Sequence, residues 1–155
     1  MFNYRNLIKN AIIFLLTFAS LIIFFHFIRF PVVDGDSMLP TYHHGDRLIV
    51  LYTDKADRGD IVTIWDESLE EYLVKRVIGV SGDHVVISHG GLSVNGHYMY
   101  EPYILQHCWA DLLDDVDITV EDGQYYVLGD NRNNSTDSRI LGAFASEDIF
   151  GRVLK

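Results

Sequence analysis

An apolar run near the N-terminus limits what this 155-residue chain can fold into more than any other feature. Residues Ala11–Ile28 form 18 consecutive positions whose only strongly polar member is His26. At about 1.5 Å per residue, a helix of this length nearly crosses a hydrocarbon core of about 30 Å, and Phe30–Val33 extend the apolar stretch. We therefore expect a transmembrane anchor at residues 11–30.

A cleaved signal peptide is the alternative interpretation of this run. Such a peptide has an apolar core of about 7–15 residues, followed by a cleavage site with small side chains. Here the run is longer and the side chains of His26–Val33 are bulky, which favours an anchor. Arg5 and Lys9 precede the run, whereas only Arg29 directly follows it. By the positive-inside rule, residues 1–10 are then cytoplasmic and the rest of the chain lies outside.

The part of the chain after Val33 is strongly acidic. It holds all 22 Asp and Glu but only nine of the 12 Lys and Arg, which gives it a formal charge of −13. This charge argues against nucleic acid as a partner and against docking on anionic lipid by charge, because both need a basic surface. The single cysteine, Cys108, excludes an internal disulfide and a cysteine-rich zinc site. No histidine pair has a helical metal-ligand spacing with a nearby acid, so we expect neither a metal nor a cofactor.

The sequence after the anchor has the pattern of short β-strands. Runs of β-branched and aromatic residues alternate with turn signals such as Gly82-Asp83 and Asn95-Gly96. No long helical periodicity appears, so residues 31–155 are expected to form an all-β domain with an antiparallel, barrel-like sheet. The expected strands are Arg47–Tyr52, Asp60–Trp65, Tyr72–Val80, His84–Ser88, Leu92–Val94, Tyr125–Leu128 and Ile149–Leu154.

Residues 84–123 are expected to contain a small insertion, because Pro102–Glu121 is the least regular part of the chain and is acidic. Farther on, Ser146-Glu147-Asp148 has the composition of a helix start, but Gly151 leaves room for about one turn only. Aromatic side chains in strands usually belong to the core. We therefore favour the core over an exposed aromatic patch on the membrane surface for four of them: Tyr98, Tyr100, Tyr103 and Trp109.

A candidate nucleophile, Ser37, follows the anchor within the segment Gly35–Thr41. A serine hydroxyl is a weak nucleophile unless a base takes its proton. Lys75 is the candidate base, because strand alternation places it on one face between Leu73 and Val77. Burial there would lower its pKa by up to about 3–5 units from about 10.4, into the range of a usable base. The other interpretation is a lysine whose stem packs on the sheet while its amine reaches water.

The segment Gly129–Arg139 has the composition of a tight loop that is rich in hydrogen bonds. Its Asp and Arg residues suggest internal ion pairs, and the hydroxyls of Ser135 and Ser138 could hold an amine in place. On its own, this composition indicates a structural loop rather than a catalytic one.

Together these segments resemble bacterial type I signal peptidase in its compact Gram-positive form. They occur in the order of that family after an N-terminal anchor, and both positions of its Ser-Lys dyad are filled. The resemblance covers Asp34–Arg152 apart from about residues 84–121. The segments are Ser37–Thr41 with Gly45-Asp46, Arg58–Val62, Lys75–Gly79 with Gly82-Asp83, and Gly129–Arg139.

The resemblance implies a serine endopeptidase that spans the bacterial cell membrane once, with its catalytic domain outside the cytoplasm. It would cleave N-terminal signal peptides from exported preproteins. Ser37 would attack the carbonyl at the cut, and neutral Lys75 would take the hydroxyl proton and later hand it to the leaving amine. The Ser37 backbone N–H would donate to the oxyanion, and Gly35 occupies the position at which many relatives carry a second donor.

Further residues match positions of the family. Ser135 would hydrogen-bond to the lysine and orient it. Substrate would lie as an added strand beside Asp34–Ser37, in contact with Asp36 and Met38. The positions that would brace the site by ion pairing are Asp130, Asp137, Arg139 and Arg76.

The implied partners are signal-peptide-bearing preproteins, with small side chains at the first and third positions before the cut, and membrane lipid. Other classes of function stay open. One is a peptidase-like assembly or binding factor for secreted or pilus proteins, and another is an anchored β-module without chemistry. A Ser-His-Asp enzyme is conceivable, since six histidines follow Ser37, whereas Leu39 excludes a Gly-x-Ser-x-Gly elbow. The sequence implies no oligomeric state.

Overall fold

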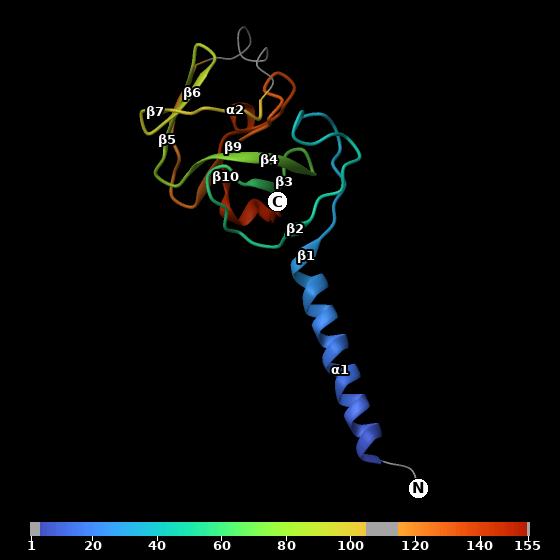
Figure 1. The fold of residues 1–155 in the computed structure, drawn as a ribbon. Coiled ribbons are helices and arrows are strands. Elements are labelled where there is room, and N and C mark those ends of the chain that lie inside the picture. The colour runs from blue at the N-terminus through green and yellow to red at the C-terminus, as the bar shows by residue number, and fades with distance from the viewer. Residues whose placement is uncertain (1–3, 105–114, 155) are drawn as a thin grey trace.

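The computed structural model describes residues 4–104 and 115–154. A long N-terminal helix is followed by antiparallel strands in two sheets (Figure 1). The expected all-β domain after one apolar helix is therefore confirmed. Two residues discussed above, Cys108 and Trp109, lie outside the described part of the chain, as do residues 105–114 of the acidic stretch Pro102–Glu121.

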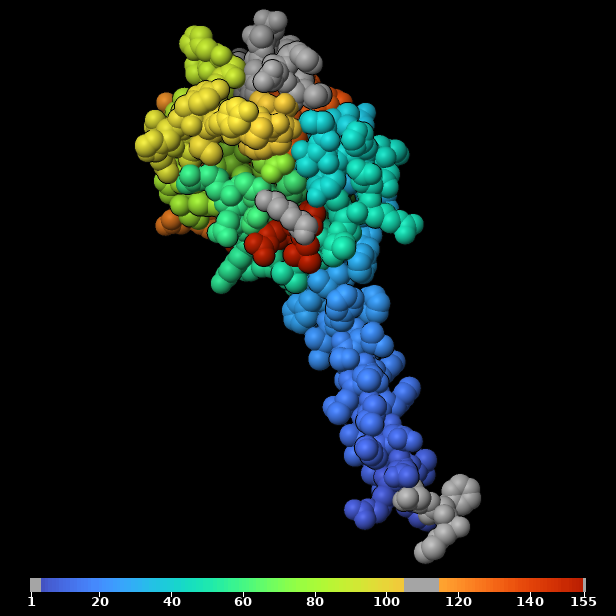
Figure 2. Space-filling view, in the orientation of Figure 1, coloured from blue at the N-terminus to red at the C-terminus, as the bar shows by residue number. Residues whose placement is uncertain are grey.

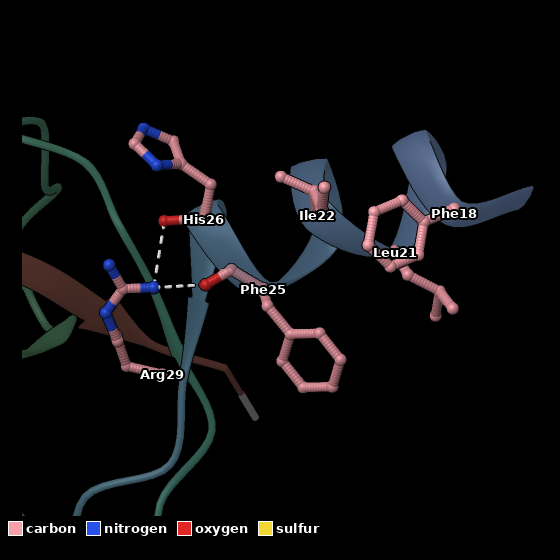
Figure 3. A pocket seen from close by; sticks show the side chains of 6 residues that line it. All are labelled: Phe18, Leu21, Ile22, Phe25, His26 and Arg29. Atoms are coloured by element: carbon pink, nitrogen blue, oxygen red, sulfur yellow. Dashed lines mark hydrogen bonds between the residues drawn. The ribbon is translucent and has the colours of Figure 1, made fainter. Parts of the chain in front are cut away.

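Helix α1 (Tyr4–Phe27) projects from the folded part of the molecule (Figures 1 and 2), and its residues are exposed. Its mean hydropathy of 2.3 and its 24 residues fit a membrane span by length and composition. The helix ends at Phe27, earlier than the anchor expected to reach residue 30. Arg29 folds back there and donates to the carbonyls of Phe25 and of His26, the latter at 3.0 Å (Figure 3). A cation thus satisfies carbonyls that the last helical turn leaves unpaired.

The main sheet has seven strands in the order β1-β2-β11-β3-β4-β9-β10. All of its pairs are antiparallel, and its two edges, β1 and β10, do not pair with each other. The β3–β4 ladder runs from Ile61↔Arg76 to Asp66↔Glu71. The strands are β1 (Ile28–Arg29), β2 (Val50–Leu51), β3 (Ile61–Asp66), β4 (Glu71–Val80), β9 (Gln124–Leu128), β10 (Phe144–Ala145) and β11 (Ile149–Val153).

The second sheet has four strands in the order β7-β6-β5-β8 and lies within the stretch expected to be an insertion. Its strands are β5 (His84–Ser88), β6 (Gly91–Val94), β7 (His97–Tyr98) and β8 (Val116–Thr119). The expectation of irregular structure was wrong for β8. Val116 and Ile118 alternate with exposed residues and pair with β5, but a four-residue strand that contains Asp117 is hard to recognise by composition.

Three hydrophobic clusters hold the domain together. The first includes Ile78 of β4 and residues of β5, β6 and β9, and so joins the two sheets. The second includes Val62, Leu73 and Val77 and lies on β3, β4, β9, β10 and β11. The third contains Val33, Met38, Leu48, Val50, Ile61 and Val153. Because it combines the segment after the anchor with β2, β3 and β11, this third cluster fixes Ser37 against the main sheet.

Two smaller expectations have different outcomes. A single 3₁₀ turn, η2 (Ser146–Asp148), confirms the short helical turn predicted before the last strand. The core interpretation was wrong for Tyr98 and Tyr100, which are 75% and 80% exposed, whereas Tyr103 is partly buried. β7 is an edge strand that pairs only with β6 among the described strands, and its Tyr98 side chain is left largely exposed.

Candidate active site

The structure brings Ser37 and Lys75 together. The Ser37 Oγ and Lys75 Nζ atoms are 3.0 Å apart, although 38 positions separate the residues in sequence. Ser37 lies at the start of a turn after the anchor, and Lys75 lies in the middle of β4 opposite Val62 of β3. This distance permits direct proton transfer between the hydroxyl and the amine.

The environment of Lys75 favours its neutral form. The residue is 3% exposed, and its neighbours on the same face of β4, Leu73 and Val77, are buried as well. Burial lowers the pKa of Lys75 to about 8, although the nearby charges of Asp137 and Glu71 partly oppose this effect. A substantial fraction of the amines is therefore unprotonated at mildly alkaline pH, and the amine can act as a base.

The turn that carries Ser37 is fixed by the loop after β9. The Asn131 backbone N–H donates to the Ser37 carbonyl at 2.9 Å, and its side-chain amide donates to the Asp36 carbonyl at 3.0 Å. Met38 is fully buried in the third cluster and does not line the cavity beside the dyad. The substrate contact implied for Met38 is therefore not supported by its position, and its side chain holds the turn instead.

Gly129 permits the loop to approach this turn closely. A Cβ atom at Gly129 would lie 2.6 Å from the Ser37 carbonyl oxygen and 2.2 Å from Ser135 Oγ. Ser135 lines the cavity beside the dyad, but its buried hydroxyl has no hydrogen-bond partner in the described part of the chain. The bond from Ser135 to Lys75 that the resemblance implied is thus not made in this structure.

Arg76 and Asp130 form a buried ion pair on the strand that carries Lys75. The guanidinium donates to both carboxylate oxygens, at 2.8 and 2.6 Å, and to the Gly59 carbonyl at 3.0 Å. Burial alone would lower the pKa of Arg76, but the hydrogen bonds and charge of Asp130 raise it overall. Thr41 also donates to Asp130, so this pair connects β4 to the Ser37 turn.

Asp137 and Arg139 form a second buried ion pair, with two contacts of 2.7 Å. Asp137 also accepts the Gly129 N–H at 2.9 Å and caps the short helix α2 (Ser138–Leu141). The four residues expected to brace the site therefore form two separate pairs around the loop after β9. Both pairs lie on segments that contact the Ser37 turn or contain Lys75.

A third set of interactions, which the sequence patterns did not indicate, is formed by Glu101, Tyr103 and Arg132. Arg132 is buried and donates to the Glu101 carboxylate, with one contact at 3.2 Å, and to the Gly129 carbonyl at 2.9 Å. The Tyr103 hydroxyl donates to Glu101 at 2.8 Å, and the Arg76 guanidinium lies 3.9 Å from the centre of the Tyr103 ring. Glu101 and Arg132 are 31 positions apart, and no sequence pattern links them.

A cavity of about 650 Å³ lies beside the dyad. Residues 31–37 line one side, residues 71–75 of β4 another, and residues 134–136 a third. β9 stops at Leu128, opposite Arg76, so residues 71–75 have no strand partner on that edge among the described residues. An unpaired strand edge in a cavity can accept an extended peptide as an added strand.

Gly35 and Asp36 lie in the lining of this cavity. The Gly35 N–H donates to His44 Nδ1 at 3.2 Å. His44 Nδ1 also lies 3.2 Å from Asp34 Oδ1. The Gly35 N–H is therefore engaged by a side chain in this structure. The Asp36 side chain is exposed, as a role in substrate contact requires.

Comparison with known proteins gives consistent matches. A family model described as "Signal peptidase, peptidase S26" matches residues 4–154. "Signal peptidase I S" of Bacillus subtilis (strain 168) is 40% identical, over 92% of this chain and 83% of that protein. "Signal peptidase I T" of the same strain is 40% identical, over 81% of this chain and 72% of that protein. A crystal structure of a signal peptidase I from Enterococcus faecalis V583 matches with a TM-score of 0.58 and 30% identity, covering 65% of this chain and 97% of that one.

These matches extend over the segments that suggested the resemblance. The range of the family model includes the apolar helix, the Ser37 turn, β4 and the loop after β9. The structural match adds that the fold of the domain is shared with a solved signal peptidase I. By its sequence over nearly its whole length and by its fold, the chain belongs to the signal peptidase family S26 of serine peptidases.

Proposed function

We propose that this protein removes N-terminal signal peptides from exported preproteins, with Ser37 as nucleophile and Lys75 as general base. The observation that carries this proposal is the 3.0 Å contact between the Ser37 hydroxyl and a buried amine whose pKa is about 8. A lysine in bulk water would be protonated near neutral pH and could not accept the proton. The names of the relatives supply the class of substrate.

The reaction would proceed in two steps. In the first, Ser37 Oγ attacks the carbonyl carbon at the cut while Lys75 Nζ takes the hydroxyl proton. The Ser37 backbone N–H stabilises the oxyanion, and the ammonium then gives its proton to the leaving amine. In the second step, Lys75 takes a proton from a water that attacks the acyl-enzyme ester, and it returns this proton to Ser37 Oγ as the ester C–O bond breaks and the peptide leaves with a new carboxyl end.

The preprotein would bind as an extended strand between residues 32–37 and the open edge of β4. Main-chain hydrogen bonds along that edge supply affinity that does not depend on sequence, and the cavity beside the dyad selects side chains. Asp36 lines this path. Helix α1 would hold the domain at the outer membrane face, with residues 1–10 in the cytoplasm, lipid around the helix and residues 31–155 outside.

Two substitutions test the dyad. Ser37→Ala and Lys75→Ala should each abolish cleavage of a signal-peptide reporter by the full chain in detergent, with product measured by electrophoresis. Lys55→Ala is the matched control, because Lys55 is exposed and does not line the cavity. Parent-like cleavage by both dyad variants would eliminate the proposed mechanism and favour a binding role.

A topology experiment tests the orientation separately. Single cysteines placed before α1 and in an exposed loop of the domain, in a variant that lacks Cys108, are labelled in intact cells with an impermeant reagent. Labelling only of the domain cysteine is expected. Labelling only of the N-terminal cysteine would reverse the proposed orientation without affecting the catalytic proposal.

A further inference from the structure

The cavity beside the dyad has a one-sided charge. Its lining includes three carboxylates, from Asp34, Asp36 and Glu71, and a single basic residue, the buried Lys75. Asp34 has a partial partner in His44, whereas no described cation forms an ion pair with Glu71. A peptide in this cavity therefore passes an exposed, uncompensated carboxylate.

Glu71 lies at one end of the cavity. It is the first residue of β4, and Lys75 follows four positions later on the same strand. At about 3.3 Å per residue, the two lie about 13 Å apart along the strand. Glu71 is therefore too far away to touch the reacting carbonyl, but it is level with a residue about four or five positions from the cut.

The negative charge at this end is reinforced by the hairpin that joins β3 to β4. Glu71 lies directly opposite Asp66, and like charges in this position repel each other. The connecting residues add Glu67 and Glu70, and residues 66–71 contain no Lys or Arg. A cationic side chain placed beside Glu71 would relieve this repulsion, whereas an anionic one would increase it.

A series of aromatic contacts shows which end of the peptide meets Glu71. Rings connect the end of α1 to the start of β4, with centres 6.4, 5.7 and 4.9 Å apart: His26–Tyr52, Tyr52–Phe150 and Tyr72–Phe150. The Glu71 end of the cavity is therefore the end connected to the anchor. A substrate whose apolar segment lies in the membrane enters from this side, so Glu71 faces residues before the cut.

The geometry points to Glu71 as a specificity-determining residue that favours a cationic over an anionic side chain at the fourth or fifth position before the cut. This inference rests on the proposed function and adds a charge preference to it. Because Glu71 is exposed, the expected effect is that of a solvent-exposed ion pair, about two- to fivefold in kcat/KM. Higher salt should reduce it by screening.

The test uses the full chain in detergent and two sets of reporter preproteins. Within each set the reporters differ only at the fourth or the fifth position before the cut, which carries Lys, Gln or Glu. For the parent, we expect kcat/KM to fall from Lys to Gln to Glu at one of these positions. Glu71→Gln should reduce the Lys/Glu ratio, and Glu71→Lys should invert it.

Glu70→Gln is the matched control, because it removes a neighbouring carboxylate that does not line the cavity. It should retain most of the parent's Lys/Glu ratio. A parent ratio of one at both positions, or an unchanged ratio in Glu71→Lys, would overturn the inference. The Gln reporter separates this failure from that of the proposed function: if the parent cleaves it without charge preference, only the specificity claim fails.

Discussion

Lys75 and Arg76 are adjacent in β4 and almost equally buried, at 3% and 7% exposed, but their pKa values shift in opposite directions. Lys75 meets a serine hydroxyl and apolar neighbours, so burial lowers its pKa to about 8. Arg76 meets the Asp130 carboxylate and the face of Tyr103, and its pKa is raised. One buried cation is thereby prepared to lose its proton, while its neighbour stays a fixed charge.

The comparison shows that burial alone does not decide the state of a cation. The deciding factor is whether a counter-charge was buried with it. Residue type follows the same logic, because a lysine titrates readily when buried whereas a guanidinium remains protonated in proteins. Strand alternation puts the two side chains on opposite faces of one strand, so the proposed proton acceptor and a buried ion pair occupy adjacent positions.

The largest expected effect separates the two residues by activity. Lys75→Met removes the proposed base while keeping a side chain of similar length. Cleavage of a reporter preprotein should fall by at least about 10⁴-fold, since loss of one member of a coupled catalytic unit costs roughly as much as loss of all. Initial rates measure this, and activity within tenfold of the parent would remove the basis of the comparison.

Arg76→Met should act on stability first. It leaves Asp130 buried without its cation, which costs about 3–5 kcal/mol of unfolding free energy. Chemical denaturation of the full chain in detergent, followed by intrinsic fluorescence, measures the loss. The double variant Arg76→Met/Asp130→Leu should recover part of it, because neither charge is then left alone. No recovery would mean that the pair acts mainly through its other partners, Thr41 and Gly59.

Lys75→Met should have the opposite effect on stability. The folded-state pKa of Lys75, about 8, lies below its ordinary value of 10.5, so protonation costs free energy in the folded state. By linkage, this cost is about 3 kcal/mol below pH 8 and disappears as the pH rises to about 10.5. The variant should therefore be more stable than the parent at pH 7, with the gain shrinking at higher pH. A loss of stability at pH 7 would show that the lysine stem contributes more packing than the desolvated charge costs.

The pH dependence of activity sharpens the same contrast. If Lys75 is the base, kcat/KM should fall about tenfold per pH unit below pH 8, as the amine becomes protonated. Arg76 stays protonated over this pH range, so its titration should not change kcat/KM between pH 5 and 10. A reporter assay between pH 5 and 10 tests this, and a rate that is flat between pH 6 and 8 would exclude an amine of this pKa as the base.

The smallest effect concerns a more distant charge. Glu71 raises the pKa of Lys75, opposing desolvation. Glu71→Gln should therefore move the acidic limb of the profile to lower pH, measured with a neutral reporter. Glu70→Gln serves again as the control. A limb that moves to higher pH would contradict the sign of this interaction.

Sequence patterns could predict those parts of the site that depend on local geometry. Alternation in β4 placed Lys75 on the same face as Leu73 and Val77, and all three are buried in the structure. The composition of the loop after β9 indicated internal ion pairs, and Asp137–Arg139 is one of them. The catalytic roles of Ser37 and Lys75 stay predictions: alternation made Lys75 a candidate base, and the resemblance to a family joined it with Ser37 as a dyad.

The parts that were missed depend on contacts between distant segments. Glu101 and Arg132 form an ion pair across 31 positions. Tyr103, which lies between β7 and β8 in the sequence, covers the guanidinium of Arg76 in β4. Ser135 was expected to reach Lys75, but its hydroxyl lies against Gly129, because of how the loop after β9 folds back on itself, which composition does not reveal. Tyr98 and Tyr100 have the composition of a core and lie on or beside an edge strand, so composition alone misassigned them.

The strand order of the main sheet has a consequence for how the chain folds during its synthesis. β2 follows the segment with Ser37, and β3 leads to the strand with Lys75, and within the main sheet β11 lies between these two strands. A nascent chain whose residues 149–153 have not yet emerged therefore lacks the strand that joins these two parts of the sheet. In such a chain, Ser37 is held near Lys75 only by contacts such as the packing of Met38 and the bonds from Asn131, so residues 149–153 complete the frame of the site last.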